Sequence, residues 1–568
     1  MTRYNQQIKF TGFAVFCLFC LLPALAFSQA KTYNEEITVV APYEPAIPDA
    51  FKINQSPKTG DSDFQIPKLN YSITPKPFDI KLNLDPISPA KMVSEPLTKL
   101  YRNYLRVGMG TYTSPYAEFF ANTMRSKDHA FGVHIRHLSS SGSLDDYATS
   151  GASTNEVEFS GKKITESHTL SGNIFYQRYV VHHYGFRTAD FDTMPAKKDL
   201  RQRFAIAGAQ VQYSSNYIKN DKLNHNLQLS YYHLADLFDA KEDHVKLNVD
   251  LDKEFKLFDL TDKQQAGLET SMSYYKQRDS LGSAGSAIIG LKPFISTNFN
   301  EYSFYAGFNI QVAADTMTRM HIYPMAEVKL RIIPNALEAY AGISGNMNRQ
   351  NYRDLSSENP FIASDITMDY SYEKFKFYGG ITSNIGRNLD FSAGVSTSDW
   401  ENLPFFVNDT TSKLANKFTI VYDDGTTLCL TADATYHASD KIKLMVHGAY
   451  QTFNLDREMK AWHKPALKVG FTGRYNIQEK IVVTGDVTWN GKSYARDLIP
   501  VAERNISQPF RVKELKGYAD VSMGLEYRYT KLLSAFLNFN NIGNVRYFRW
   551  NNYPSQRFNF MGGITFAF

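Results

Sequence analysis

The 568-residue sequence predicts an all-β fold, a transmembrane antiparallel β-barrel of about 22 strands preceded by a short extended N-terminal segment. Three observations support this prediction. Long segments alternate apolar or aromatic residues with polar ones, short and long connections follow one another in turn, and the last strand carries alternating aromatic residues. We expect the barrel to span residues 98–568. A signal peptide at residues 1–30 and a proline-rich extended segment at residues 31–97 precede it.

The composition fits a barrel better than a bundle of membrane helices. Aromatic residues make up 14% of the chain, and 36 Tyr and 40 Phe supply nearly all of them. The mean hydropathy is −0.37, whereas each membrane helix needs roughly 18 or more consecutive apolar residues. A membrane barrel shows only every second residue to lipid, so its average stays hydrophilic. A large soluble all-β protein has a similar composition and remains the alternative.

The first 30 residues have the pattern of a signal peptide. Arg3 and Lys9 precede an apolar run at 10–27, and small residues suited to cleavage lie at 24–26 and 28–30. Removing Arg3 and Lys9 lowers the formal net charge from +5 to +3. A nearly neutral exported chain argues against nucleic acid as a partner.

Cleavage would also remove two of the three cysteines, Cys17 and Cys20, and leave Cys429 alone. An intramolecular disulfide is then impossible. A closed barrel offers a different source of stability, because its hydrogen-bonded ladder has no free edge.

Residues 31–97 differ from the rest of the chain. Ten prolines fall between Pro42 and Pro96. Proline is excluded from helix interiors and central strands, so we expect an extended, partly polyproline-like periplasmic segment. A flexible leader and a segment lying along a surface both fit this composition.

The strands are predicted by alternation, as in the stretches 326–332, 467–472 and 523–529, and many of the alternating segments run for ten to fourteen residues. This length suits a tilted strand that crosses a bilayer. The charges on the polar face would line the lumen or pair across the wall; they include Glu327, Lys329, Arg331, Lys468, Arg474, Glu526 and Arg528.

The connections set the strand count. Ten short ones alternate with longer ones, and outer-membrane barrels have short periplasmic turns and long outside loops. Ten periplasmic turns with both chain ends in the periplasm imply 22 strands. The short ones lie near 126–129, 164–167, 220–221, 259–263, 300–301, 334–335, 386–388, 439–440, 478–479 and 530–531.

One stretch would break this alternation. Asp423-Asp424-Gly425 has the composition of a tight hairpin turn. We therefore expect a small hairpin within the outside loop at 400–424.

The C-terminal strand carries the most specific signal. Its alternate aromatic residues close on a terminal phenylalanine, which resembles the insertion signal read by the barrel-assembly machinery of Gram-negative outer membranes; the residues are Phe558, Phe560, Phe566 and Phe568. The preceding stretch, Asn538-Phe539-Asn540-Asn541-Ile542-Gly543-Asn544 with Tyr547 and Tyr553-Pro554, resembles the closing hairpin of TonB-dependent receptors. That resemblance implies a 22-strand barrel in outer-membrane lipid and a role in transport or reception.

A second resemblance lies near the mature N-terminus. Glu36, Ile37, Thr38, Val39 and Val40 resemble a TonB box, an extended segment that adds a strand to the energy-coupling protein TonB. The sequence departs from the family in the next stretch. Only about 55 residues separate Pro42 from the first strand, which is too few for the family's folded plug domain. We expect infolded loops, residues 31–97 or a partner protein to fill the lumen.

Three functions are therefore weighed: a plugless transporter or receptor, a subunit of an outer-membrane assembly or secretion complex, and a barrel enzyme. The chain has no phosphate loop, zinc-ligand spacing or redox cysteine pair, so we expect neither enzymatic activity nor a cofactor. His182 and His183 are adjacent on a strand and point to opposite faces, which argues against a shared metal. We expect both to be exposed.

Aromatic residues in the long connections are candidate ligand contacts: Trp400, Phe405, Phe406, Trp462 and Trp550. Such side chains suit sugar or peptide surfaces. They equally suit the membrane's aromatic belt or packing between loops, and the pattern favours these two alternatives.

Overall fold

The barrel is built from strands longer than those of most soluble proteins. A computed structural model describes Ser72 and residues 100–568, apart from 125, 218–221, 257–262, 412–413 and 499–509. The predicted signal peptide and the TonB-box-like residues 36–40 lie outside the described residues. Within them, no helix is both long and apolar enough to cross a membrane.

The barrel wall consists of β1 (Asn103–Gly110), β2 (Ser114–Asn122), β3 (His129–Ser140), β4 (Ala152–Ile164), β5 (His168–His182), β6 (Arg201–Ser215), β7 (Asn224–Ala235), β8 (Lys241–Phe255), β9 (Lys263–Asp279), β10 (Gly282–Phe299), β11 (Tyr302–Ala314), β12 (Thr318–Ile333), β13 (Leu337–Arg349), β14 (Tyr370–Ile385), β15 (Leu389–Asn408), β16 (Phe418–Ser439), β17 (Ile442–Leu455), β18 (Leu467–Ile477), β19 (Ile481–Asn490), β22 (Tyr518–Arg528), β23 (Leu533–Asn540) and β26 (Asn559–Ala567). The long loops contain η2 (Thr188–Asp190), α2 (Lys197–Leu200), α3 (Tyr352–Glu358), β20 (Ser493–Leu498), β21 (Phe510–Leu515), β24 (Phe548–Trp550) and β25 (Tyr553–Pro554).

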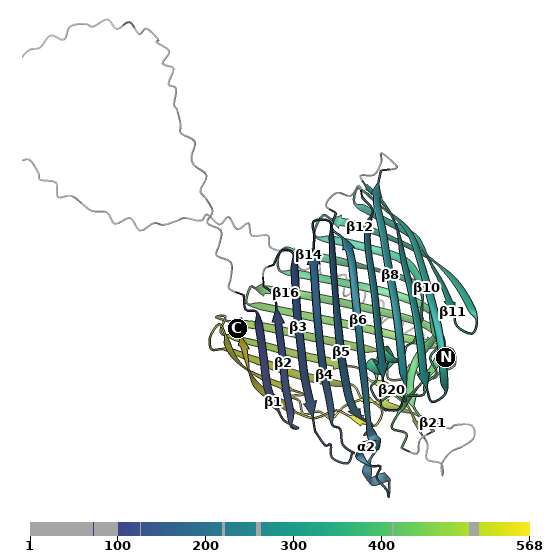
Figure 1. The fold of residues 1–568 in the computed structure, drawn as a ribbon, viewed down its shortest axis with the longest axis vertical. Coiled ribbons are helices and arrows are strands. Elements are labelled where there is room, and N and C mark those ends of the chain that lie inside the picture. Colours follow the sequence, from purple (N-terminus) through teal and green to yellow (C-terminus); the bar gives the residue numbers. More distant parts are fainter. Residues whose placement is uncertain are drawn as a thin grey trace, which may run out of the picture. The chain divides into compact units, whose positions relative to one another are not determined.

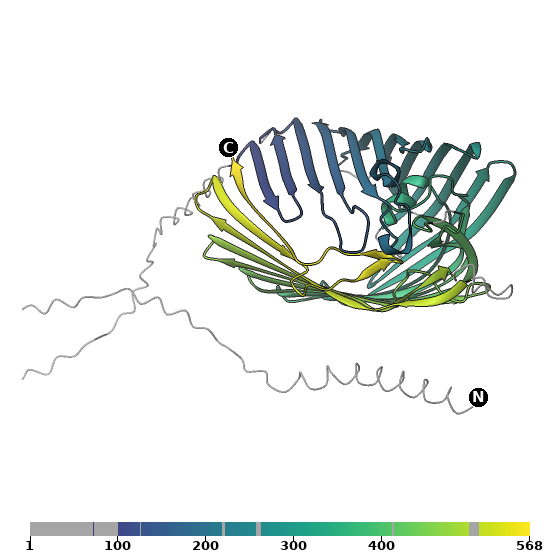
Figure 2. The same ribbon diagram turned by 90° about the horizontal axis from the view of Figure 1, so that it is seen from below.

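The wall is one antiparallel sheet of 22 strands, as the sequence predicts. Strands that follow one another along the chain are paired, and β19 pairs with β22 because the β20–β21 hairpin lies between them. The pairing of β1 with β26 closes the sheet, with Leu105 opposite Phe566. Figures 1 and 2 show the strands following one another in sequence order around the wall.

The positions of the ten short connections are confirmed, whereas the alternation in length is only partial, because the connections at 111–113, 280–281 and 315–317 are equally short. Each of the ten short connections lies between two consecutive paired strands, although 220–221 and 259–262 are themselves outside the described residues. We call this end of the barrel the turn end and the opposite one the loop end. Because the strand number is even, β1 starts and β26 finishes at the turn end, where Asn103 and Phe568 exchange two backbone hydrogen bonds.

The outer face of the wall is apolar. Large hydrophobic side chains are exposed on alternate positions, such as Phe131 (59%), Ile174 (64%) and Phe377 (55%). Exposure of so many large apolar groups fits a surface in contact with lipid. Phe558, Phe560, Phe566 and Phe568 are also exposed on this face; their role as an insertion signal stays a prediction.

The predicted hairpin at Asp423-Asp424-Gly425 is wrong. These residues lie inside β16, which continues through them and pairs with β15, so that Gly425 faces Trp400 and Val421 faces Phe405. The register shifts between Trp400 and Leu403, and the Asn402 backbone N–H donates to the Asp424 carboxylate at 2.9 Å. Residues with turn chemistry here accompany a β-bulge, not a chain reversal.

Candidate functional site

The loop between β13 and β14, residues 350–369, folds into the barrel. Its apolar side chains Tyr352, Leu355 and Ile362 are almost fully buried, in one cluster with Phe204 and Leu234 of the wall. On β6 and β7 these wall residues alternate with lipid-facing ones such as Val211 and Leu229, so they belong to the inner face. The loop is therefore held against the inside of the wall by hydrophobic packing.

Two buried carboxylates fix the same loop. Glu242 on β8 has no exposed surface and accepts hydrogen bonds from the backbone N–H groups of Tyr352 (2.7 Å) and Arg353 (3.3 Å). It also accepts one from the Tyr232 hydroxyl at 2.8 Å. One side chain thus satisfies two backbone donors and a hydroxyl that would otherwise be buried without a partner, and it ties the start of α3 to the wall.

Asp236, between β7 and β8, makes the second attachment. Its carboxylate accepts from the Tyr352 hydroxyl at 2.9 Å, from the Gln202 amide at 3.0 Å and from the Ser364 hydroxyl. Loop residues at both ends of the segment, Tyr352 and Ser364, thus share one acidic partner. This arrangement fixes the loop in a single position.

A second loop, residues 541–558, packs onto the first. The Tyr553 ring stacks on Phe361 with centroids 3.7 Å apart, and Trp550 packs edge-on against Phe406 and Phe418. The loop at 456–466 belongs to the same group of packed loops. We call loops 350–369, 456–466 and 541–558, with the neighbouring ends of β15 and β16, the loop layer.

His463 joins three parts of the loop layer. Its Nδ1–H donates to the Phe406 carbonyl at 3.0 Å, while Nε2 accepts the Asn551 backbone N–H at 3.2 Å. This pairing requires the neutral ring. Burial of the ring lowers the pKa of His463 to about 4, which agrees with the neutral form.

The predicted aromatic contacts lie within this packing. Phe405, Phe406, Trp462 and Trp550 are all at least 94% buried, and the Trp400 indole donates to the Thr427 hydroxyl at 3.1 Å. The favoured alternative, packing between loops, describes the four buried rings. A direct ligand contact at these positions stays a prediction.

The expectation of two exposed histidines is wrong. His182 and His183 are 8% and 1% exposed, because the loop after β5 folds back over them. The His183 ring lies near Phe238, and neither ring nitrogen has a hydrogen-bond partner among the described residues; burial lowers the pKa of His183 to about 3. Among the described residues, no three His, Cys, Asp or Glu side chains form a group suited to a metal ion.

A basic pocket of about 290 Å³ lies where the loop layer meets the inner wall of β18, β19 and β22. Lys468, Asn490 and Tyr518 face it from the wall, on the side opposite lipid-facing Leu467 and Trp489. We define the basic pocket by its five charged residues, Glu358, Lys464, Lys468, Lys516 and Arg549.

The charges in the basic pocket are unbalanced. Four cations and one carboxylate give a formal charge of +3. Glu358 is paired with Lys464, with Nζ and Oε1 2.5 Å apart. In the part of the chain that the structure describes, Lys468, Lys516 and Arg549 have no acidic partner, and all three are exposed. Unpaired cations in a concave site attract anions and raise their local concentration.

A stacked aromatic pair stands beside the basic pocket. Tyr518 and Tyr547 lie parallel with centroids 3.9 Å apart, and the Tyr547 hydroxyl donates to Asp520 at 2.8 Å. The Arg549 guanidinium lies 5.7 Å from the Trp550 ring centroid. The pocket therefore offers cations beside aromatic faces, a combination suited to an anionic ligand with planar rings.

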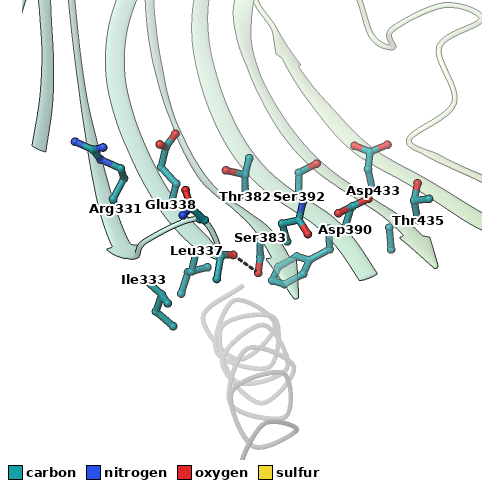
Figure 3. A pocket seen from close by; sticks show the side chains of 15 residues that line it. Arg331, Ile333, Leu337, Glu338, Thr382, Ser383, Asp390, Ser392, Asp433 and Thr435 are labelled. Atoms are coloured by element: carbon teal, nitrogen blue, oxygen red, sulfur yellow. Dashed lines mark hydrogen bonds between the residues drawn. The ribbon is translucent and has the colours of Figure 1, made fainter. Parts of the chain in front are cut away.

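The inner wall at the turn end is polar as well. Figure 3 shows Arg331, Glu338 and Asp433 on one side of the wall and Ile333 and Leu337 on the other. The Asp433 carboxylate lies 2.5 Å from His447, and the Arg331 guanidinium donates to the Asn300 carbonyl at 2.6 Å. The lumen thus has a polar lining from the loop layer to the turn end.

Sequence patterns identify only part of this site. Lys468 is predicted to lie on the inner face, and its alternation with Leu467 and Val469 suffices for that. Lys464, Lys516 and Arg549 lie in long connections without periodicity, and only tertiary packing brings them together. Glu242 and Asp236 look like ordinary surface acids in the sequence.

The closed 22-strand wall, its apolar outer face and its polar lumen define a transmembrane barrel of the outer-membrane class. No protein-family model and no curated protein matches the chain. Solved structures of outer-membrane receptors have the same fold.

Three of these structures illustrate the likeness. The pyoverdine outer membrane receptor FpvA from Pseudomonas aeruginosa PAO1, bound to pyoverdine, is 12% identical with a TM-score of 0.62, covering 83% of this chain and 79% of that one. The FpvAI–pyocin S2 complex has 13% sequence identity and a TM-score of 0.62, and the match covers 83% of this chain and 70% of that one. The ferric-catecholate import receptor Fiu from E. coli K12 has 10% sequence identity and a TM-score of 0.60, and the match covers 82% of each chain. At such identities the likeness concerns the fold.

Proposed function

We propose that this chain is an outer-membrane transporter or receptor of the TonB-dependent type, without enzymatic activity, that takes up a small anionic ligand. The basic pocket carries the proposal, because its formal charge of +3 on the inner wall beside the loop layer has no further acidic partner among the described residues. The receptors with the same fold include ones whose ligands are pyoverdine or ferric catecholates. An anionic iron chelate is therefore the first ligand class to test.

The route through the barrel follows from the same features. In this proposal the loop layer closes the outer end in place of a full plug domain, and residues 36–40 couple the barrel to TonB. Breaking the contacts of Glu242 and Asp236 would release residues 350–369 and open a path along the polar lumen. A partner protein bound through residues 31–97 is the alternative.

Iron-limited growth tests the proposal in cells that lack the gene. We expect the wild-type chain to restore growth on an anionic ferric tris-catecholate and not on a neutral ferric tris-hydroxamate. The Lys468→Ala/Lys516→Ala/Arg549→Ala variant should lose about tenfold in uptake, roughly the effect of weakening binding by 1.4 kcal/mol. Lys441→Ala/Lys480→Ala/Lys531→Ala, which removes three exposed lysines at the turn end, is the matched control.

A substitution within residues 36–40 tests the proposed coupling to TonB. Val39→Pro removes a backbone donor needed for strand addition, so it should abolish uptake and leave ligand binding unchanged. Failure of both chelates to support growth would contradict the transport proposal. A stable envelope complex that is lost on deletion of residues 31–97 would favour the assembly-subunit alternative.

A further inference from the structure

A second group of unpaired cations lies on the outer face of the barrel, away from the basic pocket. Strand register sets its height above the lipid-facing residues. Across β3, β4, β5 and β6, residues in register form rows on the outer face. One row is apolar and consists of Ile135, Val157, Tyr176 and Ala207.

The next rows toward the loop end are polar and then basic. One row up are His137, Asn155 and Arg178, with Ala205 beside them. Two rows up are Ser139, Ser153, Val180 and Arg203, and three rows up are His182 and Arg201. Since two residues of a strand rise about 7 Å, the first arginine lies about 7 Å beyond the last apolar row. The basic rows therefore lie beyond the apolar rows, towards the loop end.

A cavity of about 520 Å³ opens at the top of these rows. Lys197 and Lys198 of α2 and Arg201 of β6 line it, together with His182 and the hydroxyl side chains Ser140, Ser141 and Ser153. The three cations are exposed, and within the described residues none has an acidic partner. In that part of the chain, no carboxylate lines the cavity.

The local fold keeps this cavity open. His182 Nδ1 contacts the Gly151 carbonyl at 2.6 Å and so joins the loop after β3 to the end of β5. The backbone N–H of His183 donates to the Leu200 carbonyl at 2.7 Å, which holds α2 beside the same strand. The cations are thus held on one side of the cavity and the serines on the other.

We propose that this cavity binds the phosphate of an outer-leaflet lipid headgroup. The guanidinium of Arg201 and the two ammonium groups match a phosphate, and the hydroxyls of Ser140 and Ser153 can donate to its remaining oxygens or to a sugar, whereas that of Ser141 donates to the Tyr112 carbonyl. The acyl chains of such a lipid lie against the apolar rows below, where Phe159, Ile174 and Tyr176 are exposed. Free inorganic phosphate has the same charge and lacks this second contact, so we assign the lipid as the ligand.

Native mass spectrometry of the full-length protein in detergent tests this assignment. The probes are a diphosphorylated glucosamine lipid carrying acyl chains, the same lipid without phosphate, and inorganic phosphate. We expect one bound copy of the phosphorylated lipid, at least tenfold weaker binding of the dephosphorylated lipid, and no retained inorganic phosphate.

Variants locate the site. Lys197→Glu/Lys198→Glu changes only exposed residues of a loop helix and should weaken lipid binding at least tenfold, while Arg201→Lys should give a smaller loss because lysine cannot bind phosphate in a bidentate manner. Lys441→Glu/Lys480→Glu at the turn end is the matched control and should bind like wild type. Retained heat-modifiable migration on a gel shows that each barrel is folded.

Unchanged lipid binding by Lys197→Glu/Lys198→Glu would overturn the site. Equal binding of both lipids, or of inorganic phosphate and lipid, would overturn the headgroup assignment. The basic pocket is untouched by these variants, so uptake of the anionic chelate should remain at the wild-type level.

Discussion

A few buried polar residues hold the infolded loop at the loop end of this barrel. Glu242 is the clearest example, since its carboxylate collects two backbone donors and one hydroxyl in a site without exposed surface. Glu242 stabilises the loop because it satisfies buried donors, and a donor that is buried without an acceptor costs about 1–3 kcal/mol of stability. Glu242 therefore holds the start of residues 350–369, beside the contacts of Asp236 and the apolar packing.

Replacement of Glu242 by alanine should release the loop. Glu242→Ala leaves the backbone N–H groups of Tyr352 and Arg353 and the Tyr232 hydroxyl without their acceptor. We expect amide hydrogen exchange in residues 350–369 to rise at least tenfold, with the wall strands unaffected. Glu301→Ala, in an exposed turn at the other end, is the control. Unchanged protection of residues 350–369 would show that the carboxylate does not hold the loop.

The neutral ring of His463 makes the loop layer sensitive to acid. Burial lowers its pKa to about 4 from an ordinary 6.5, so the unfolded loop binds a proton before the folded one does. The stabilisation is complete above pH 6.5 and is lost as the pH falls from 6.5 towards 4. Hydrogen exchange in residues 456–466 should accelerate over this range. The non-titrating His463→Gln variant should respond less, and an equal response would reject this residue as the cause.

At the scale of elements, strands and loops differ in how far sequence alone predicts them. Strands follow a local rule, because a residue's face depends only on its position along the strand, and Lys468 and Phe560 lie on the expected faces. The Asp423-Asp424-Gly425 stretch shows where the rule fails. A turn signal and a β-bulge use the same residues, and only the paired strand β15 decides between them.

The loop layer obeys no local rule. Trp462 and Trp550 are far apart in the sequence, and their burial follows from contacts that no spacing encodes. The same holds for Lys516 and Arg549, which the fold brings to one pocket. Long connections fold by tertiary packing, so their aromatic content indicates burial or binding without separating the two.

Removal of the infolded loop should open the barrel. Replacing residues 350–369 with a short glycine–serine linker deletes α3 and the contacts to Glu242 and Asp236. In planar lipid bilayers we expect the variant to conduct ions steadily, whereas the wild-type barrel should be closed or nearly so. Equal conductance of the two proteins would mean that another segment closes the lumen.

At the scale of the whole molecule, the barrel has three distinct surfaces. The apolar outer face fits a surface in contact with lipid, the loop layer lies at the loop end, and the basic pocket lies where that layer meets the wall. In the proposed function, a ligand path through the 22-strand wall opens when these loops move. We propose transport of an anion because it would account for the unbalanced charge of the basic pocket.

Ligand binding to the purified full-length protein tests this account most directly. Isothermal titration with an anionic ferric tris-catecholate should give saturable binding of one chelate per barrel. Affinity should fall with added salt and about tenfold in the Lys468→Ala/Lys516→Ala/Arg549→Ala variant. Absence of saturable binding, or equal affinity of the variant and of a neutral ferric chelate, would contradict a receptor for anionic ligands.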